Sequence, residues 1–472
     1  MGSLEKRQTL VLAGSGIAMD RVTKRIGLLD HVGGGNLGDD ATQTAVIQNI
    51  KTRWPHAQIA AFSMNPADTE KRHGIPSYAI RRTTLVGSNP FVTYFDLDGD
   101  ASPSGKRVVS FASRMKSCLR KHRLLFRVLK LLKLTLVRAP KTFFAELLFL
   151  FKSYRILRSL DLLVISGGGQ LLDCWGGPWE FPYTIWKWIV LARLARVRRV
   201  FLNVGAGPLE HPLSIFFVMR ALRLANYTSF RDWKSQTLIQ QIGFTARSNV
   251  VADCVYSLGT PACDTGTRGR AANGIVGISP MAYCHPGVYW KKDRRLYDSF
   301  IQKLSAFGSA LISSGHRIVL FTTDIWFDSQ TIEDLKNALE TEIGLAQSHW
   351  ITVRHVETTE ALLSTMCLMD YVVTCRFHGV VFAHLLNKPV LAISPHPKVA
   401  TLMNDIGLSE YCVNIDSFDS DLLLRRFSLL ARNGESIKGV MAETLDGFRR
   451  KLASQFDDLF PRATPAPSCG DS

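Results

Sequence analysis

The 472-residue sequence lacks several features that would place it in a familiar class. Its nine cysteines form no CxxC pair and no zinc-ligand spacing, which argues for a reducing compartment rather than a disulfide framework. No uncharged apolar run reaches the roughly 18 residues that a membrane span needs, because Lys or Arg interrupts every candidate. Residues 1–18 make a poor signal peptide, since glycines interrupt their short apolar stretch. We therefore expect a cytoplasmic enzyme that does not span a membrane.

Common cofactor signatures are missing as well. The chain contains neither a Walker A sequence nor a GxGxxG sequence, so a nucleotide fingerprint is absent. No cluster of ligand residues suggests a metal, and no recognition motif accompanies the basic residues as it would in a nucleic-acid-binding protein. We expect no cofactor, no metal and no nucleic-acid partner.

Acidic residues are almost absent from residues 106–158. This segment holds 15 Lys and Arg residues and a single acid, Glu146, giving +14 and leaving only +3 of the total of +17 for the rest of the chain. Leucines and cations alternate at helical spacing over 124–134, and an apolar stretch follows at 143–151. Such a pattern is typical of a helix on an anionic membrane surface, but also of ordinary helices that pack their leucines inward. Both interpretations stay open.

Outside that insert, short apolar runs alternate with longer amphipathic ones, which predicts βαβ units and mainly parallel sheets. We expect strands at 25–29, 58–62, 162–165, 200–204 and 227–230, and a second series at 274–278, 318–322, 351–353, 371–374 and 390–393. The predicted fold is α/β, with two Rossmann-like domains facing each other across a cleft. Its parts are an N-terminal extension (1–24), a first domain carrying the insert (25–262), a linker (263–273), a second domain (274–460) and a disordered tail (461–472).

A glycine-rich loop follows the first expected strand. Backbone N–H groups can approach an anion or a sugar closely in such a loop, and the helix after it adds positive potential. The residues concerned are Gly34, Gly35, Asn36 and Gly38. Asp39 and Asp40 come next, at the expected start of a helix, and act either as catalytic groups or merely as helix caps.

Two further strand ends carry candidate residues. Gly167, Gly168 and Gly169 follow the strand at 162–165 and shape the same cleft, with Asp173 shortly after them. Arg231 follows the strand at 227–230. Its guanidinium suits a carboxylate or a phosphate, but a structural ion pair with Asp232 or Asp253 is an equal alternative.

The most informative residues are Arg376, Phe377, His378 and Gly379, which follow the apolar run at 371–375. Ligands of open α/β sheets bind beyond the carboxyl ends of the strands, so a guanidinium and an imidazole at that point indicate an anion site. Lys398, after the next expected strand, adds a third cation. The alternative for His378 is a plain helix-start residue.

Together these motifs resemble, in order, the spaced motifs of the polysaccharide pyruvyltransferase family, over roughly residues 24–408. They are GGNLGD at 34–39, SGGG at 166–169 with Asp173, SFRD at 229–232, and RFHG at 376–379 followed by Lys398. The resemblance implies a two-domain architecture like that of GT-B glycosyltransferases. It also implies transfer of a pyruvyl group from phosphoenolpyruvate onto two sugar hydroxyls, with a ketal as product and phosphate released.

By the same resemblance, Arg376, Phe377, His378 and Arg231 bind phosphoenolpyruvate. His378 is then the expected general acid, and Asp39, Asp40 and Asp173 are the candidate bases. We expect the acceptor to be a lipid-linked sugar precursor, at the inner face of the cytoplasmic membrane. Two alternatives stay open: a GT-B glycosyltransferase that uses a nucleotide sugar, and a noncatalytic, membrane-associated partner in envelope polysaccharide assembly.

Overall fold

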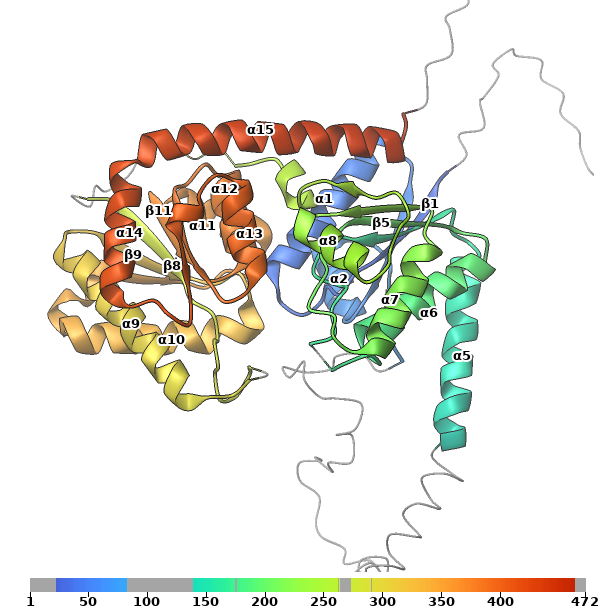
Figure 1. Cartoon of the computed structure of the whole chain (residues 1–472), viewed down its shortest axis with the longest axis horizontal. Coiled ribbons are helices and arrows are strands. Elements are labelled where there is room, and N and C mark those ends of the chain that lie inside the picture. Colours follow the sequence, from blue (N-terminus) through green and yellow to red (C-terminus); the bar gives the residue numbers. More distant parts are fainter. Residues whose placement is uncertain are drawn as a thin grey trace, which may run out of the picture.

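Two parallel β-sheets form the framework of the molecule (Figure 1). The computed structural model describes residues 23–82, 139–174, 176–261, 263, 273–289 and 291–462. The first sheet has seven strands in the order β3-β2-β1-β4-β5-β6-β7, and the second has six in the order β10-β9-β8-β11-β12-β13. Helices pack around each sheet, so the predicted α/β class with two Rossmann-like sheets is confirmed.

In the first half, β1 pairs in parallel with both β2 and β4, which makes it a central strand. The strands are β1 (Arg25–Leu29), β2 (Gln58–Ser63), β3 (Ser77–Ala79), β4 (Leu162–Ser166), β5 (Arg198–Val204), β6 (Tyr227–Phe230) and β7 (Asn249–Val250). The helices are α1 (Leu37–Arg53), α2 (Pro66–His73), α5 (Ala139–Leu157), α6 (Phe181–Leu194), α7 (Pro212–Arg223), α8 (Trp233–Gln241) and the short η2 (Cys254–Ser257).

In the second half, β11 lies between β8 and β12. The strands are β8 (Ile275–Ser279), β9 (Arg317–Phe321), β10 (Ile351–Arg354), β11 (Tyr371–Thr374), β12 (Val390–Ser394) and β13 (Cys412–Asn414). The helices are α9 (Arg294–Ser313), α10 (Ile325–Ile343), η3 (Leu345–Trp350), α11 (Thr359–Cys367), α12 (Phe377–Leu385), α13 (Pro397–Asp405), η4 (Ser409–Tyr411), α14 (Ser420–Arg432) and α15 (Gly434–Leu459).

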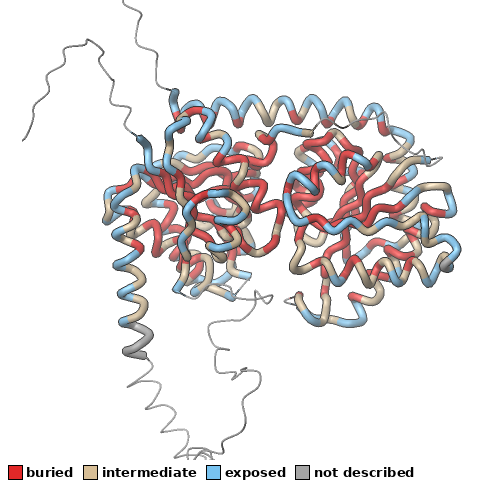
Figure 2. The backbone as a smooth tube through the Cα atoms, turned by 180° about the vertical axis from the view of Figure 1, so that it is seen from behind, coloured by how far each residue is buried: buried red, intermediate tan, exposed pale blue. Residues whose placement is uncertain are grey.

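The central strands are buried on both faces. Every residue of β4 and of β12 is buried, as expected for parallel sheets covered by helices on two sides. Figure 2 shows buried backbone running through both sheets, with the exposed residues on the surrounding helices and loops. The edge strands β3, β7 and β13 have at most three residues each, too few to leave a periodic pattern in the sequence.

The last helix, α15, runs along both halves (Figure 1). Near its end, Gln455 donates to Asn203 Oδ1 (2.8 Å) on β5 and to Tyr227 Oη (2.9 Å) on β6. Arg53 at the end of α1 donates to Asp457 (2.8 Å). The end of the chain predicted to be the second domain thus packs against the first sheet. The domain boundaries given above stay a prediction.

Three findings bear on the expectations from composition. Cys263 and Cys367 form a disulfide, so the expectation that the cysteines form no disulfides fails for this pair, whose 104-residue separation no local spacing could reveal. Among the described residues, no helix is long and apolar enough to cross a membrane. Most of the basic insert, including 124–134, and nearly all of both termini lie outside the described residues, whereas 143–151 belongs to α5.

Candidate functional site

The two halves meet where the carboxyl ends of their strands face each other. The loop after β1 bonds to the loop after β9: Leu37 N donates to Thr323 O (2.9 Å), and Ile325 N donates to Gly35 O (2.9 Å). An isolated bridge joins Asn36 to Asp324. The site therefore lies at the edge of both sheets, where ligands of open α/β sheets bind.

Glycines in the first loop allow this close approach. A Cβ on Gly38 would lie 1.9 Å from His378 Nδ1, and a Cβ on Gly35 would lie 2.9 Å from the Trp326 ring. Asn36 caps α1, because its Oδ1 accepts from Gly38 N (3.0 Å). Nothing lies within 4 Å of the Cβ position of Gly34. The cap is thus Asn36, which removes capping as the explanation for Asp39 and Asp40.

The triple-glycine loop after β4 admits three neighbouring side chains. A Cβ on Gly167 would lie 2.2 Å from Thr42, and one on Gly168 would lie 2.5 Å from His31. Gly169 has Arg231 as a neighbour at 3.8 Å from its Cβ position. These glycines leave room for side chains of Thr42, His31 and Arg231, and their role in shaping a ligand site stays a prediction.

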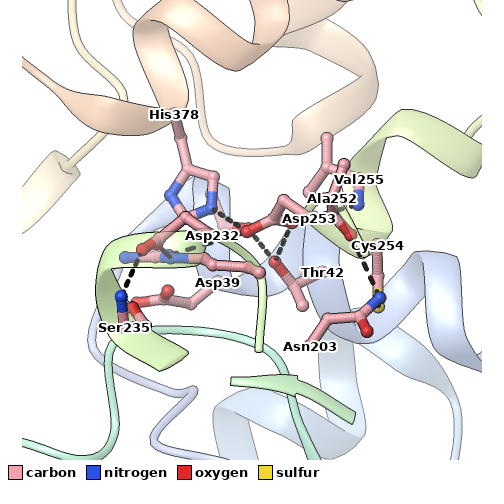
Figure 3. Close-up of polar contacts among 12 residues, drawn as sticks. Asp39, Thr42, Asn203, Asp232, Ser235, Ala252, Asp253, Cys254, Val255 and His378 are labelled. Carbon is pink, nitrogen blue, oxygen red and sulfur yellow. Dashed lines mark hydrogen bonds and ion pairs between the residues drawn. The ribbon is translucent and has the colours of Figure 1, made fainter. Parts of the chain in front are cut away.

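A buried carboxylate joins the two halves of the site. Asp253 Oδ2 lies 3.6 Å from Arg231 Nη1 and 3.7 Å from His378 Nε2, although these residues come from opposite halves. Its other oxygen accepts from Val255 N (3.1 Å) and Thr42 Oγ1 (3.4 Å), and Figure 3 shows the carboxylate between Thr42 and His378. Burial alone would raise the pKa of Asp253, but its interactions with His378 and Arg231 outweigh burial and lower it. The carboxylate therefore stays ionised at neutral pH.

Arg231 also contacts the second half through an aromatic ring. Its guanidinium carbon lies 4.1 Å from the ring centroid of Phe377, a cation–π distance. Asp232 lies 3.6 Å from Arg231 Nε, but among the described residues that nitrogen and His378 Nε2 have no hydrogen-bond partner. A Cβ on Gly205 would lie 2.7 Å from Arg231 Nε. Arg231 thus has the acidic neighbours that the sequence suggested, and it also contacts Phe377 of the other half; its role as a ligand-binding group stays a prediction.

Arg376 is held differently. Its Nε and Nη2 donate to the two oxygens of the fully buried Asp328 at 2.7 and 2.6 Å, and Nη2 lies 3.4 Å from Asp324. Burial alone would lower the pKa of Arg376, but the two carboxylates raise it. A bidentate pair of this kind fixes the guanidinium. Protein carboxylates therefore offset much of its positive charge, which leaves less to attract a ligand.

Asp39 belongs to a row of three titratable groups. His31 Nε2 lies 3.0 Å from Asp39 and His31 Nδ1 lies 3.0 Å from Asp30. Burial alone would lower the pKa of His31, but the charge of Asp39 and the contacts with both carboxylates raise it to about 10. Burial alone would raise the pKa of Asp39. His31, and to a smaller extent the charges of His378 and Lys398, instead lower this pKa well below its usual range. Asp39 is thus an ionised carboxylate held by an imidazolium and influenced by cleft cations.

The other two candidate bases face different partners. Asp40 Oδ2 lies 3.3 Å from Arg72 on α2, and burial raises the pKa of Asp40 to about 7. Asp173 Oδ2 accepts from the backbone N–H groups of Glu210 (3.0 Å) and His211 (2.8 Å). Asp40 is therefore bound to α2 and Asp173 to a backbone turn, which leaves Asp39 as the candidate nearest the cleft cations.

Lys398 completes the site at the start of α13. Its side chain reaches solvent, yet protein atoms surround the position on several sides. This desolvation, and then the charges of Arg231 and Arg376, lower the pKa of Lys398 to about 8. The three predicted cations Arg231, Arg376 and Lys398 are thus close enough to influence one another.

The sequence interpretation missed His31 and Asp30 after β1, and Asp324 and Asp328 after β9. The signal was available for three of them, since Asp30, His31 and Asp324 lie within three residues of a strand end, as Arg376 does. Asp328 lies in the first turn of α10, which Asp324 caps. The same reasoning, applied to acidic residues as well as to cations, would have found those three.

Comparisons with known proteins agree with this architecture. The UDP-GlcNAc 2-epimerase of Neisseria meningitidis bound to UDP-GlcNAc has a TM-score of 0.52 at 9% identity, covering 93% of this chain and 99% of that one. A glycosyltransferase of Rickettsia africae ESF-5 has 0.51 at 8%, covering 94% and 100%. The UDP-GlcNAc 2-epimerase of Methanocaldococcus jannaschii has 0.51 at 9%, covering 87% and 93%. At such identities the likeness shows the fold alone, which is GT-B-like.

A search of curated protein sequences gave no match. Residues 36–397 match a protein family described as polysaccharide pyruvyl transferase. The match begins at Asn36, which caps α1, and ends just before Lys398, so it includes both strand-end arginines and His378. This chain belongs to the polysaccharide pyruvyl transferase family.

Proposed function

We propose that this protein transfers the pyruvyl group of phosphoenolpyruvate onto two hydroxyls of a sugar, forming a ketal and releasing phosphate. The observation that carries the proposal is the convergence of Arg231 and His378, from opposite halves, on Asp253 at 3.6 and 3.7 Å. A guanidinium and an imidazole so placed can bind a small anion between the two sheets. The membership of a pyruvyl transferase family supports the same reaction.

In this proposal Arg231 and Lys398 supply most of the binding to the donor anion. Arg231 offers a guanidinium fork with an Nε that has no hydrogen-bond partner among the described residues, and Lys398 adds an ammonium. Phe377 fixes the plane of the guanidinium by stacking on it. Arg376 contributes less, because Asp328 already takes two of its nitrogen donors.

His378 acts as the general acid. Its proton goes to the methylene carbon of phosphoenolpyruvate, so that C2 becomes cationic and a sugar hydroxyl oxygen attacks C2 while losing its proton to a base. The C2–O bond to phosphate then breaks, phosphate leaves with the electron pair, and the second hydroxyl adds with loss of its proton. Asp253 Oδ2, 3.7 Å from His378 Nε2, positions the imidazole for the transfer.

Asp39 is the proposed base for the hydroxyls. Since its pKa is lowered, it is a weak base, but C2 becomes cationic and makes the attacking hydroxyl acidic, so a strong base is not required. The finer parts of the proposal are a lipid-linked acceptor and a reaction at the inner face of the cytoplasmic membrane. The basic segment at 106–158 supports both.

Purified protein, phosphoenolpyruvate and a glycoside acceptor provide the test. We expect released phosphate and an acid-labile ketal on the acceptor, detected by mass spectrometry. His378→Ala should lower turnover by about 10²–10⁴-fold, whereas His355→Ala, at a side chain that is 72% exposed, serves as the matched control. Unchanged turnover in His378→Ala, with an unchanged melting temperature, contradicts the assignment of the acid.

Measurements of ligand binding distinguish the proposed reaction from two alternative functions. A GT-B glycosyltransferase should be stabilised against heat by UDP-sugars rather than by phosphoenolpyruvate. The buried ion pair between Arg376 and Asp328 favours the second alternative, a noncatalytic assembly partner. Such a protein should be stabilised by neither compound and should release no phosphate.

A further inference from the structure

Helix α5 carries two apolar faces, although packing against the body requires only one. On its inner face Ser153 and Leu157 are buried, and the ring of Phe149 meets Trp188 of α6 edge-on at 6.4 Å. Figure 1 shows α5 continuing away from the first half, beyond α6 and α7. The inner contacts account for the attachment of the helix and leave its other side to be explained.

The outer face exposes large apolar side chains. Leu147 is 44% exposed, Leu148 56% and Phe151 58%, and Phe144, one turn earlier, is 68% exposed. The spacing of 144, 147, 148 and 151 places the four on one side of an α-helix. Scattered exposed apolar residues are ordinary, but a contiguous stripe along a helix marks an interaction surface.

The charges around this stripe are positive. Glu146, the single acid of residues 106–158, turns toward the body, where Lys187 Nζ lies 3.0 Å from its carboxylate. Lys152 and Arg155 on the same helix and Arg158 directly after it are exposed. The sequence from 106 to 141, leading into α5, adds twelve Lys and Arg and no acid. The outer side thus combines apolar side chains with cations and presents no described carboxylate.

We propose that the outer face of α5, formed by Leu147, Leu148 and Phe151 with the cations beside it, docks on an anionic lipid bilayer. A helix of this kind lies in the plane of the interface, its apolar side chains among the acyl chains and its cations near the lipid phosphates. The described residues contain no helix suited to crossing the bilayer, which fits attachment to the surface. A second copy of the chain fits less well, because two segments carrying +14 would repel each other.

The inference stands on α5 and goes beyond the proposed reaction. Its test uses the full-length protein in flotation with phosphatidylcholine vesicles, either neutral or containing about one third phosphatidylglycerol. We expect binding to the anionic vesicles that weakens as salt is added. Leu148→Asp/Phe151→Asp should weaken binding by at least about tenfold, because two apolar side chains no longer enter the bilayer.

The matched control is Leu296→Asp/Leu368→Asp, which makes the same change at 43% and 46% exposed leucines on the second half. It should bind as the unmodified protein does. Absence of binding by the unmodified protein, or equal binding by the α5 variant, overturns the proposal. A dimer by light scattering that becomes a monomer in the α5 variant also overturns it, since the stripe is then a subunit interface. Phosphate release with a water-soluble acceptor should be unchanged in the α5 variant, so failure here is distinct from failure of the proposed reaction.

Discussion

Arg231 and Arg376 both stand at the carboxyl end of a parallel strand, Arg231 directly after β6 and Arg376 two residues after β11, yet their surroundings differ. Arg376 makes two short bonds to Asp328, at 2.6 and 2.7 Å, and has Asp324 as a further neighbour. Arg231 has only 3.6 Å contacts to its carboxylates, and Phe377 stacks on it. Two arginines that both follow the end of a parallel strand are therefore unequal as ligand-binding groups.

The difference follows from where acids stand in the neighbouring loop. Asp324 and Asp328 lie at the start of α10, which follows β9. Strand β8 separates β9 from β11, and both aspartates contact Arg376 after β11. Short, desolvated bonds fix a guanidinium, and removal of either partner leaves a buried charge. We infer that Arg376 acts mainly to stabilise the second half, whereas Arg231, whose contacts with carboxylates are 3.6 Å long, is the arginine that binds the donor. The first two predictions below test this division of roles, and the other two test the remaining charged groups of the site.

Arg231→Met should cause the largest change, a loss of about a thousandfold in kcat/KM for phosphoenolpyruvate, because a guanidinium aimed at developing negative charge is removed. The melting temperature should fall less than in Arg376→Met, since the contacts of Arg231 with carboxylates are longer and Asp253 keeps its hydrogen bonds from Val255 and Thr42. Steady-state phosphate release measures the first quantity and calorimetry the second. A variant that retains full kcat/KM would remove Arg231 from the donor site.

Arg376→Met should lower the free energy of unfolding by about 3 kcal/mol, since Asp328 is left buried without its partner. Denaturant titration measures this loss. Arg376→Met/Asp328→Leu should recover much of it, because no unpaired charge then remains. If Arg376→Met lowers kcat/KM as strongly as Arg231→Met and leaves stability unchanged, the two arginines are equivalent after all.

The pH dependence of phosphoenolpyruvate binding tests whether the site depends on Lys398 as well as on the arginines. The pKa of Lys398, about 8, lies below the usual value of 10.5, so the ammonium loses its proton as pH rises through 8. The dissociation constant of phosphoenolpyruvate should therefore rise by about tenfold between pH 7 and pH 9. Lys398→Arg keeps its charge over this range and should flatten the curve, as followed by calorimetric titration. The same slope in both proteins would assign the pH dependence to another group.

His31→Gln should give the smallest effect, a loss of about 1 kcal/mol of stability at pH 6. The pKa of His31 is raised in the folded state, to about 10 from 6.5. Its contribution is therefore fully present below pH 6.5 and is lost as pH rises through 10. The difference in unfolding free energy between the two proteins should shrink over that interval, as measured by denaturant titration at several pH values. A constant difference would show that His31 acts by packing alone.

The central strands and the positions of the site motifs could be predicted, because both are local properties of the chain. An apolar run followed by glycine or a cation predicts a strand and its carboxyl end, and parallel strands bring such ends to one edge. The contacts of Gly38 could not be predicted in the same way. Its neighbour His378 is 340 residues away, and the lack of a Cβ matters only once the two halves meet.

The partners of the candidate acids show the same limit. Asp39, Asp40 and Asp173 were equal candidates by sequence, but His31, Arg72 and a backbone turn give them three different environments. The disulfide between Cys263 and Cys367 likewise joins residues that no local spacing relates. Residues 1–22 and 83–138, which hold most of the basic insert, lie outside what the structure describes, so expectations about them remain predictions.

The sequence by itself determined the α/β class, the strand ends at which the motifs stand and the concentration of positive charge before and along α5. Each of these depends on residue type and periodicity within a short stretch of chain. Only the tertiary structure decided which arginine is held by buried carboxylates, which aspartate lies near the cleft cations, and that α5 has an exposed apolar face. Charges interact over a few ångströms in space, and separation along the chain does not reveal which groups come that close.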